Sequence, residues 1–93
     1  MRITYDPCDG NAIPDGYVRF TADFYYGVGG SFITSSENLI TAFRLGIKTG
    51  KFEADNIIFV FGNKEFQADK AGRIADWPDG FCDTSLNMLM ELL

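Results

Sequence analysis

ITSSENLITAFRLGIKTGKF (residues 33–52) decides the fold, because it predicts a strand end, a capped helix and a stop signal in one run. Thr34 stands three residues before Glu37, the spacing of a capping box at a helix N-terminus. Gly50 supplies the left-handed position that commonly ends a helix. We therefore expect a helix over about residues 35–49. Its apolar face comprises Leu39, Ile40, Phe43 and Ile47.

Upstream of this helix, apolar residues occupy every second position of residues 17–28, and the positions between them are largely polar. This alternation predicts a strand with one buried face. The glycines of YGVGGSF then indicate a tight turn into a second, antiparallel strand. They lack the GK[ST] ending and the GxGxxG spacing of phosphate-binding loops. One face of the expected strand holds Val18, Phe20, Ala22, Phe24, Tyr26 and Val28; the other holds Tyr17, Arg19, Thr21, Asp23 and Tyr25.

Downstream, NIIFVF (residues 56–61) is a continuous apolar run, which favours a central strand covered on both faces. Turn residues at 62–63 and 69–72 bound a further short strand, and a last helix is expected over about residues 84–93. The whole chain of 93 residues is predicted to be a single α+β domain. It would have a mostly antiparallel sheet of about four to six strands and two helices.

Composition excludes several classes of protein. Apolar residues make up 46% of the chain, which favours a folded core, and no run reaches the about 20 residues of a membrane span. The N-terminus lacks a secretory pattern, so a cytoplasmic protein is expected. There is no histidine, and the two cysteines lie far apart, so neither a metal nor a cofactor is expected. Whether Cys8 and Cys82 pair is left open.

The net charge of −5 is unevenly placed, because no Lys or Arg follows Arg73. An acidic balance argues against direct binding to nucleic acid. It favours either plain solubility or a protein partner with a basic surface. Trp77 is either a core residue or an exposed anchor, and the tyrosines form either an aromatic patch or a solvated face. The expected partner-binding residues are Asp76, Trp77, Asp79, Phe81, Asp83, Glu91, Tyr17 and Tyr25.

Two stretches, FITSSENLITAFRLGIKTGKFEADNIIFVF and GRIADWPDGFCD, resemble the C-terminal end of bacterial ABC/AAA-like ATPases related to the overcoming-lysogenization-defect group. That family is often linked to phage defence. In it a strand ends in Thr-His-Ser-Glu, a helix and an apolar strand follow, and the chain closes on a Gly-Arg-Ile and Trp-Pro tail. The resemblance covers about residues 32–93.

The departures from that family remove its chemistry. Ser35 occupies the position of the switch histidine, and a hydroxyl has neither the reach nor the titration of an imidazole. The phosphate loop, the signature motif and the acidic pair that holds magnesium are missing. Ser35 and Ser36 also have no histidine partner for a nucleophilic triad. We therefore expect a chain that is not an enzyme.

Two hypotheses follow from these observations. The first is a small acidic binding protein that inhibits or regulates a partner, a profile shared by phage and mobile-element anti-defence proteins such as anti-CRISPR proteins. The alternative is a remnant or split C-terminal module of a defence-type ATPase that acts in trans with a partner ATPase. The serine at position 35 disfavours the second hypothesis, because a working half-site would keep its histidine.

Overall fold

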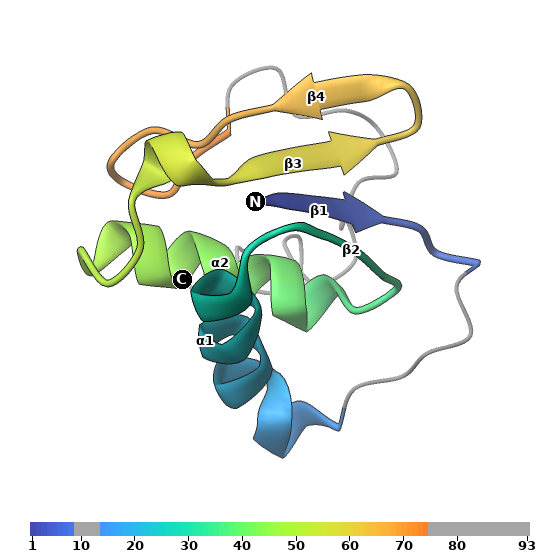
Figure 1. The fold of residues 1–93 in the computed structure, drawn as a ribbon, viewed down its shortest axis with the longest axis horizontal. Coiled ribbons are helices and arrows are strands. Elements are labelled where there is room, and N and C mark those ends of the chain that lie inside the picture. Colours follow the sequence, from blue (N-terminus) through green and yellow to red (C-terminus); the bar gives the residue numbers. More distant parts are fainter. Residues whose placement is uncertain (9–13, 75–93) are drawn as a thin grey trace, which may run out of the picture.

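A computed structural model describes residues 1–8 and 14–74, which form a four-stranded sheet with two α-helices (Figure 1). The α+β class, the number of strands and the helix expected near residues 35–49 are confirmed. The helix expected over residues 84–93 lies outside the described residues. The elements in chain order are β1 (Arg2–Tyr5), η1 (Asp15–Tyr17), α1 (Val18–Val28), β2 (Ser31–Thr34), α2 (Glu37–Lys48), η2 (Ala54–Asn56), β3 (Ile58–Phe61) and β4 (Lys64–Phe66).

The strands lie in the order β2-β1-β3-β4, and most of their pairing is parallel. β1 pairs in parallel with both β2 and β3, whereas β3 and β4 form an antiparallel hairpin. The expectation of a mostly antiparallel sheet is therefore wrong. Parallel neighbours cannot be joined by a tight turn and need a crossover connection, which is usually a helix. Here α1 connects β1 to β2, and α2 connects β2 to β3 (Figure 1).

The expectation of a strand over residues 17–28 is wrong, because Tyr17 ends η1 and residues 18–28 form helix α1. Its apolar residues fit a period of two, but Val18 and Ala22 also share one helical face and are the two that are buried. The expected turn between antiparallel strands is instead the junction of α1 with β2. Gly29 (φ 74°) and Gly30 (φ 92°) adopt left-handed backbone angles there, which glycine tolerates.

Helix α2 begins two residues later than a cap at Thr34 would place it. The N-cap is Ser36, whose hydroxyl accepts a hydrogen bond from the Leu39 N–H at 3.1 Å. Thr34 is buried, and its hydroxyl accepts from the Ser36 N–H at 3.0 Å, so it fixes the turn before the helix. The expected apolar face of α2 is confirmed as buried. Gly50 takes the left-handed position after the helix, as expected (φ 79°).

Two serine substitutions test the assignment of Ser36 as the N-cap of α2. Ser36→Ala should lower the free energy of unfolding by about 1 kcal/mol, because it removes an acceptor from the first turn of α2. Ser31→Ala, at an exposed position of β2, is the matched control and should change it by less than about 0.5 kcal/mol. Urea denaturation measures both. Equal losses in the two variants would contradict the assignment of Ser36 as the cap.

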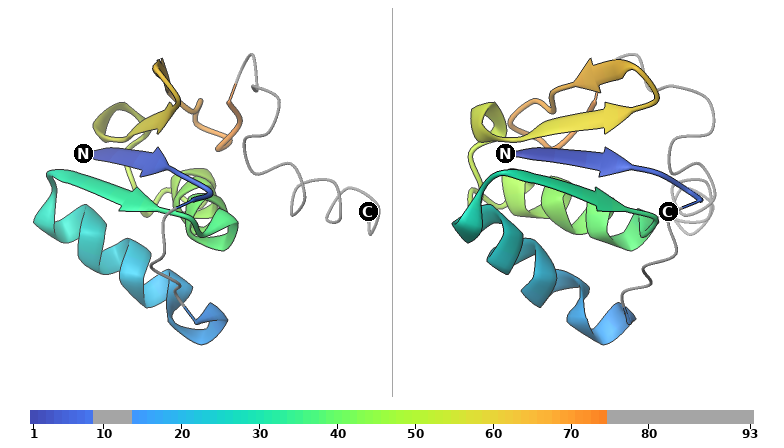
Figure 2. Two further views of the ribbon diagram at one scale, coloured as in Figure 1. Left: turned by 90° about the vertical axis from the view of Figure 1, so that its right-hand side faces the viewer. Right: turned by 45° about the vertical axis from the view of Figure 1, so that its right-hand side comes forward.

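Both helices pack on one face of the sheet (Figure 2). Ile3, Phe32 and Phe59 lie opposite one another in the register of β1, β2 and β3, and they point to the core. Phe43 of α2 and Ala22 of α1 belong to the same cluster. On the opposite face, the Arg2 guanidinium forms an ion pair with Glu65 at 2.7 Å. The face that carries the helices therefore holds the hydrophobic core.

β3 is central in strand order, as expected, although its two faces are not equally covered. Phe59 on the helix side is fully buried, whereas Ile58 and Val60 on the other side are half-buried. The turns expected at residues 62–63 and 69–72 are both present. Gly62 has a φ of 62° in the β3–β4 hairpin, and the Asp69 carboxylate accepts from the N–H groups of Ala71 and Arg73.

Candidate functional site

Helix α1 carries two apolar faces, and only one of them is used by the fold. Val18 and Ala22 are buried against the core. On another side of the helix, four large apolar side chains remain 57–69% exposed. Their spacing of three, four and four residues places them in one continuous line along the helix axis. This exposed line, which we call the α1 stripe, consists of Tyr17, Phe20, Phe24 and Val28.

Aromatic contacts hold the inner side of α1 in place. Tyr25 stacks on Phe32 of β2, with ring centroids 3.9 Å apart and planes inclined by 7°. Tyr26 stacks on Phe52 at 4.4 Å, and its hydroxyl accepts hydrogen bonds from the Glu53 N–H and the Asn56 amide. The helix is thus fixed at several points. The α1 stripe is presented by a rigid element, which lowers the entropy lost when a partner docks.

On the side of α1 that faces α2, an ion pair links α1 to the segment that follows α2. The Lys51 ammonium lies 2.6 Å from the Asp23 carboxylate, and both side chains are about half exposed. A groove of about 140 Å³ lies between the helices here, lined by residues that include Arg19, Leu45 and Gly46. Pockets for small organic ligands usually measure about 300–1,000 Å³. The groove is therefore too small for such a ligand.

A larger hollow of about 410 Å³ lies beside the N-terminus, where Met1, Tyr26 and Asn56 form part of its lining. The Met1 ammonium donates to the Asn56 carbonyl at 2.5 Å. Asp55 is the one carboxylate in the described lining of this hollow, and the other ionisable groups there are the Met1 ammonium and the Tyr26 hydroxyl. The ammonium donates to the Asn56 carbonyl and the hydroxyl accepts from the Glu53 N–H and the Asn56 amide, so both help to hold the fold.

The structure separates the two tyrosines that were expected to bind a partner together. Tyr17 is 63% exposed and belongs to the α1 stripe. Tyr25 lies on the inner side of the helix, half-buried against Phe32, because the segment is a helix and not a strand. Tyr5 is buried in the core next to Phe61. The other expected partner-binding residues lie outside the described residues: Asp76, Trp77, Asp79, Phe81, Asp83 and Glu91.

Sequence reasoning missed Phe20 and Phe24, which it assigned to the buried face of a strand. Both are more than half exposed, at 69% and 57%. The signal that finds them is the presence of two apolar sets at helical spacing in one segment. Residues 18 and 22 form the inner set, and the α1 stripe forms the outer set. A helix needs only one such set to pack on its own sheet, so the second set is available for a partner.

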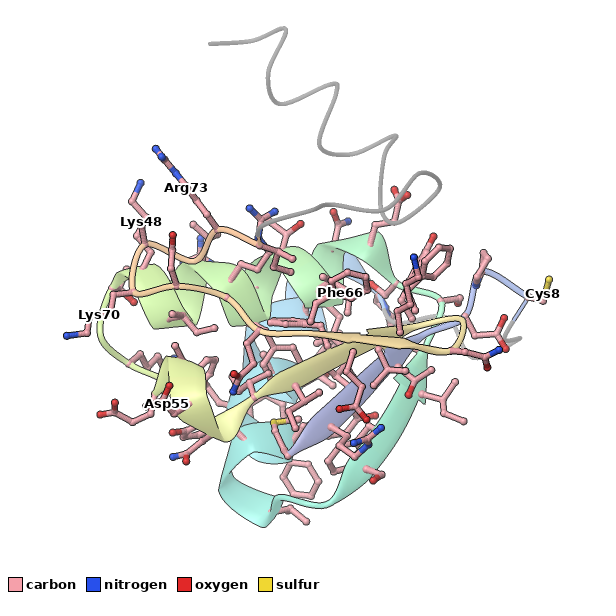
Figure 3. All side chains as sticks on the ribbon, turned by 90° about the horizontal axis from the view of Figure 1, so that it is seen from above. Cys8, Lys48, Asp55, Phe66, Lys70 and Arg73 are labelled. Atoms are coloured by element: carbon pink, nitrogen blue, oxygen red, sulfur yellow. The ribbon has the colours of Figure 1, made fainter. Side chains whose placement is uncertain are left out.

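The net negative charge does not belong to the described part of the chain. All eight Lys and Arg residues lie within it, together with eight of the 13 acidic residues. Figure 3 shows Lys48, Lys70 and Arg73 projecting from one corner, where the 69–73 loop packs on α2. The Arg44 Nε–H donates to the Gly72 carbonyl there at 2.7 Å. The remaining five acids are Asp9, Asp76, Asp79, Asp83 and Glu91.

Two other expected features have a place in the structure. Gly29 and Gly30 follow the C-terminus of α1, whose partial negative charge repels phosphate, so these glycines are unsuited to a phosphate loop. Ser35 is half-buried between β2 and the cap of α2. Cys8 is exposed, and its pairing with Cys82 lies outside the described residues.

Within residues 1–8 and 14–74, no group of three or more His, Cys, Asp or Glu side chains gathers in a way that could hold a metal ion. Neither helix in that part of the chain is long and apolar enough to cross a membrane.

Comparison with models of known protein families, with curated proteins and with solved structures gives no match for this chain. The strand–helix–strand order over residues 31–61 agrees with what the ATPase resemblance implies. That order is common to many unrelated folds, so it identifies no family. The resemblance therefore remains a prediction.

Proposed function

We propose that this chain is a non-enzymatic protein-binding domain, a small acidic inhibitor or regulator that acts by covering a surface of a protein partner. The single observation that carries the proposal is the α1 stripe, with its four large apolar side chains 57–69% exposed. Since a buried aromatic side chain removes about 150–250 Å² from water, the stripe offers roughly 450 Å² of apolar surface. Patches of that size on small domains are often interaction sites.

The shape and charge of the stripe favour a protein over other partners. It is a convex row on a helix, which fits the groove of a partner, as in helix-in-groove recognition. Arg19 and Asp23 beside it carry opposite charges, so it lacks the basic footprint of a nucleic-acid site. Helices that lie on membranes expose a polar face rich in Lys and Arg. The side of α1 opposite the stripe is instead packed against the core.

The acidic C-terminal third keeps a secondary part in this proposal. Asp76, Asp79, Asp83 and Glu91 follow the last cation of the chain, so a basic partner surface would be attracted to them. That attraction speeds encounter more than it adds affinity. Trp77 and Phe81 lie among these acids in sequence and would add apolar contacts. In this division of roles, the stripe provides affinity and the acids provide steering.

Site-specific photo-crosslinking tests the proposal in cells of the source organism. A photoreactive phenylalanine analogue in place of Phe20 should give a protein adduct, because position 20 lies at the centre of the stripe. The same analogue in place of Lys64, exposed on β4, is the matched control and should give much less. Excess unlabelled wild-type chain should suppress the adduct, whereas a folded Phe20→Ser/Phe24→Ser chain should not. Equal yields at both positions, or equal suppression by both competitors, would refute the proposal.

A further inference from the structure

We propose that the partner fitted by the α1 stripe is a second copy of this chain, joined through an antiparallel pair of α1 helices about a two-fold axis. The inference rests on the proposed function of α1 as a docking face and names what occupies it. Three features carry it: the symmetry of the stripe, the two open glycines beside it and the area that it offers.

The two central residues of the α1 stripe lie symmetrically about the level of Ala22, and its two end residues fall opposite glycines. Phe20 and Phe24 lie two positions before and after Ala22, and Tyr17 and Gly27 lie five positions before and after it. A two-fold axis at this level sets Phe20 of one copy against Phe24 of the other, twice. It also sets each Tyr17 over the partner's Gly27. An isologous interface requires such a self-complementary pattern.

The glycines at the two ends of the stripe make room for the partner's end side chains, with Tyr17 over Gly27 and Val28 over Gly16. A Cβ added at Gly16 or Gly27 would meet nothing within 4 Å, so the space above each is open. Gly27 lies inside α1 and is not among the described glycines with positive φ, so its backbone does not require glycine. Such a glycine weakens a helix by about 1 kcal/mol relative to alanine. Close approach of a second helix provides a physical reason for it.

The area of the stripe agrees with what a specific dimer needs. Two copies would bury roughly 900 Å² of apolar surface from the four side chains alone. Flanking residues need to add only about 100 Å² for the total to reach the roughly 1,000 Å² expected of a biological interface. Arg19 and the Asp23–Lys51 ion pair lie on the side of α1 that faces α2, so pairing through the stripe does not create a block of like charge. Two pairs of aromatic rings at the centre also match the composition of interface cores.

Sedimentation equilibrium of the full chain, over a wide range of concentration, tests the dimer and its register. The wild-type chain should form dimers. Phe20→Lys and Phe24→Glu should each weaken dimerisation by about 30-fold or more, because each places an unpaired charge at the centre. A mixture of the two variants should regain most of the lost dimer affinity. In the mixed dimer the ammonium at position 20 of one chain faces the carboxylate at position 24 of the other. Leu45→Glu, at an exposed apolar position of α2, is the control and should leave the dimer intact.

The outcomes separate this inference from the proposed function. A wild-type chain that stays monomeric overturns the dimer, and so does a mixture of folded variants that shows no recovery. If the Phe20 adduct then has the mass of a different protein, the docking function stands without the dimer. An adduct formed within one chain, to residues 75–93, would assign the stripe to this chain's own C-terminal third and overturn both. An adduct of twice the chain mass supports the dimer and the stripe as a docking face, and it assigns any contact with a different, basic partner to another surface of the chain.

Discussion

Phe43→Ala should cost about 3–5 kcal/mol of the free energy of unfolding, one of the largest effects expected of a single substitution among the described residues. Phe43 is fully buried in α2, and its ring centroid lies 5.8 Å from that of Phe52. Removing the ring leaves a cavity between α2 and the rest of the core, which surrounding side chains only partly fill. A domain of 93 residues has a total stability of roughly 5–14 kcal/mol, so this loss is about a fifth of the total or more.

Urea denaturation and the near-ultraviolet circular dichroism of the aromatic rings measure this loss. The matched control is Leu45→Ala, two positions along the same helix but 43% exposed. It should change the free energy of unfolding by no more than about 0.5–1 kcal/mol. If the two variants lost similar stability, Phe43 would not be the centre of the core. A shallow transition in Phe43→Ala, with helix content retained, would indicate lost packing and not lost secondary structure.

Gly46→Ala should lower the free energy of unfolding by about 1–3 kcal/mol, although alanine is the better helix former by about 1 kcal/mol. Gly46 is buried in α2 with the Phe52 ring directly on it, and an added Cβ would overlap two atoms of that ring and lie 3.1 Å from its Cγ. Phe52 also stacks on Tyr26 of α1, so its ring cannot move freely. The methyl group therefore forces the α1–α2 contact apart.

Gly27→Ala is the matched control for this effect, because its site is open. Measured in a Phe24→Glu background, which removes the proposed pairing of α1, it should raise the free energy of unfolding by about 0.5–1 kcal/mol. Thermal and urea denaturation compare Gly46→Ala with the wild-type chain, and Phe24→Glu/Gly27→Ala with Phe24→Glu. A gain in stability from Gly46→Ala would show that Phe52 does not lie on this glycine. A loss from Gly27→Ala in that background would show that its Cβ site is not open.

The contrast between these glycines shows where sequence reasoning stops in the candidate site. Both stand within helices, and helix propensity gives them the same value. Gly46 cannot carry a side chain because the Phe52 ring lies on it. Gly27 has no described neighbour within 4 Å of an added Cβ, so its surface is open to a partner. Tyr17 was expected at a binding surface and is exposed in the α1 stripe. Tyr25 was expected beside it but lies against Phe32. Phe20 and Phe24, expected in a core, form the centre of the stripe.

The sequence by itself determined the elements whose signals are local. Helix α2 follows from its apolar spacing and its terminal glycine, β3 from its apolar run, and the β3–β4 hairpin from Gly62 and Asn63. Such signals depend on residues within one or two turns of each other. The cap was misplaced by two residues because Thr34 and Ser36 offer similar hydroxyls, and the exact donor depends on the backbone geometry.

Only the tertiary structure decided the state of residues 17–28 and the direction of the sheet. The apolar residues of that segment fit both a period of two and a helical period, so the local pattern does not choose between them. The choice follows from the placement of β1 beside β2 in parallel, because two parallel neighbours need a crossover between them. Once α1 is that crossover, its inner side packs on Phe32 and Phe52, and the α1 stripe must face outward.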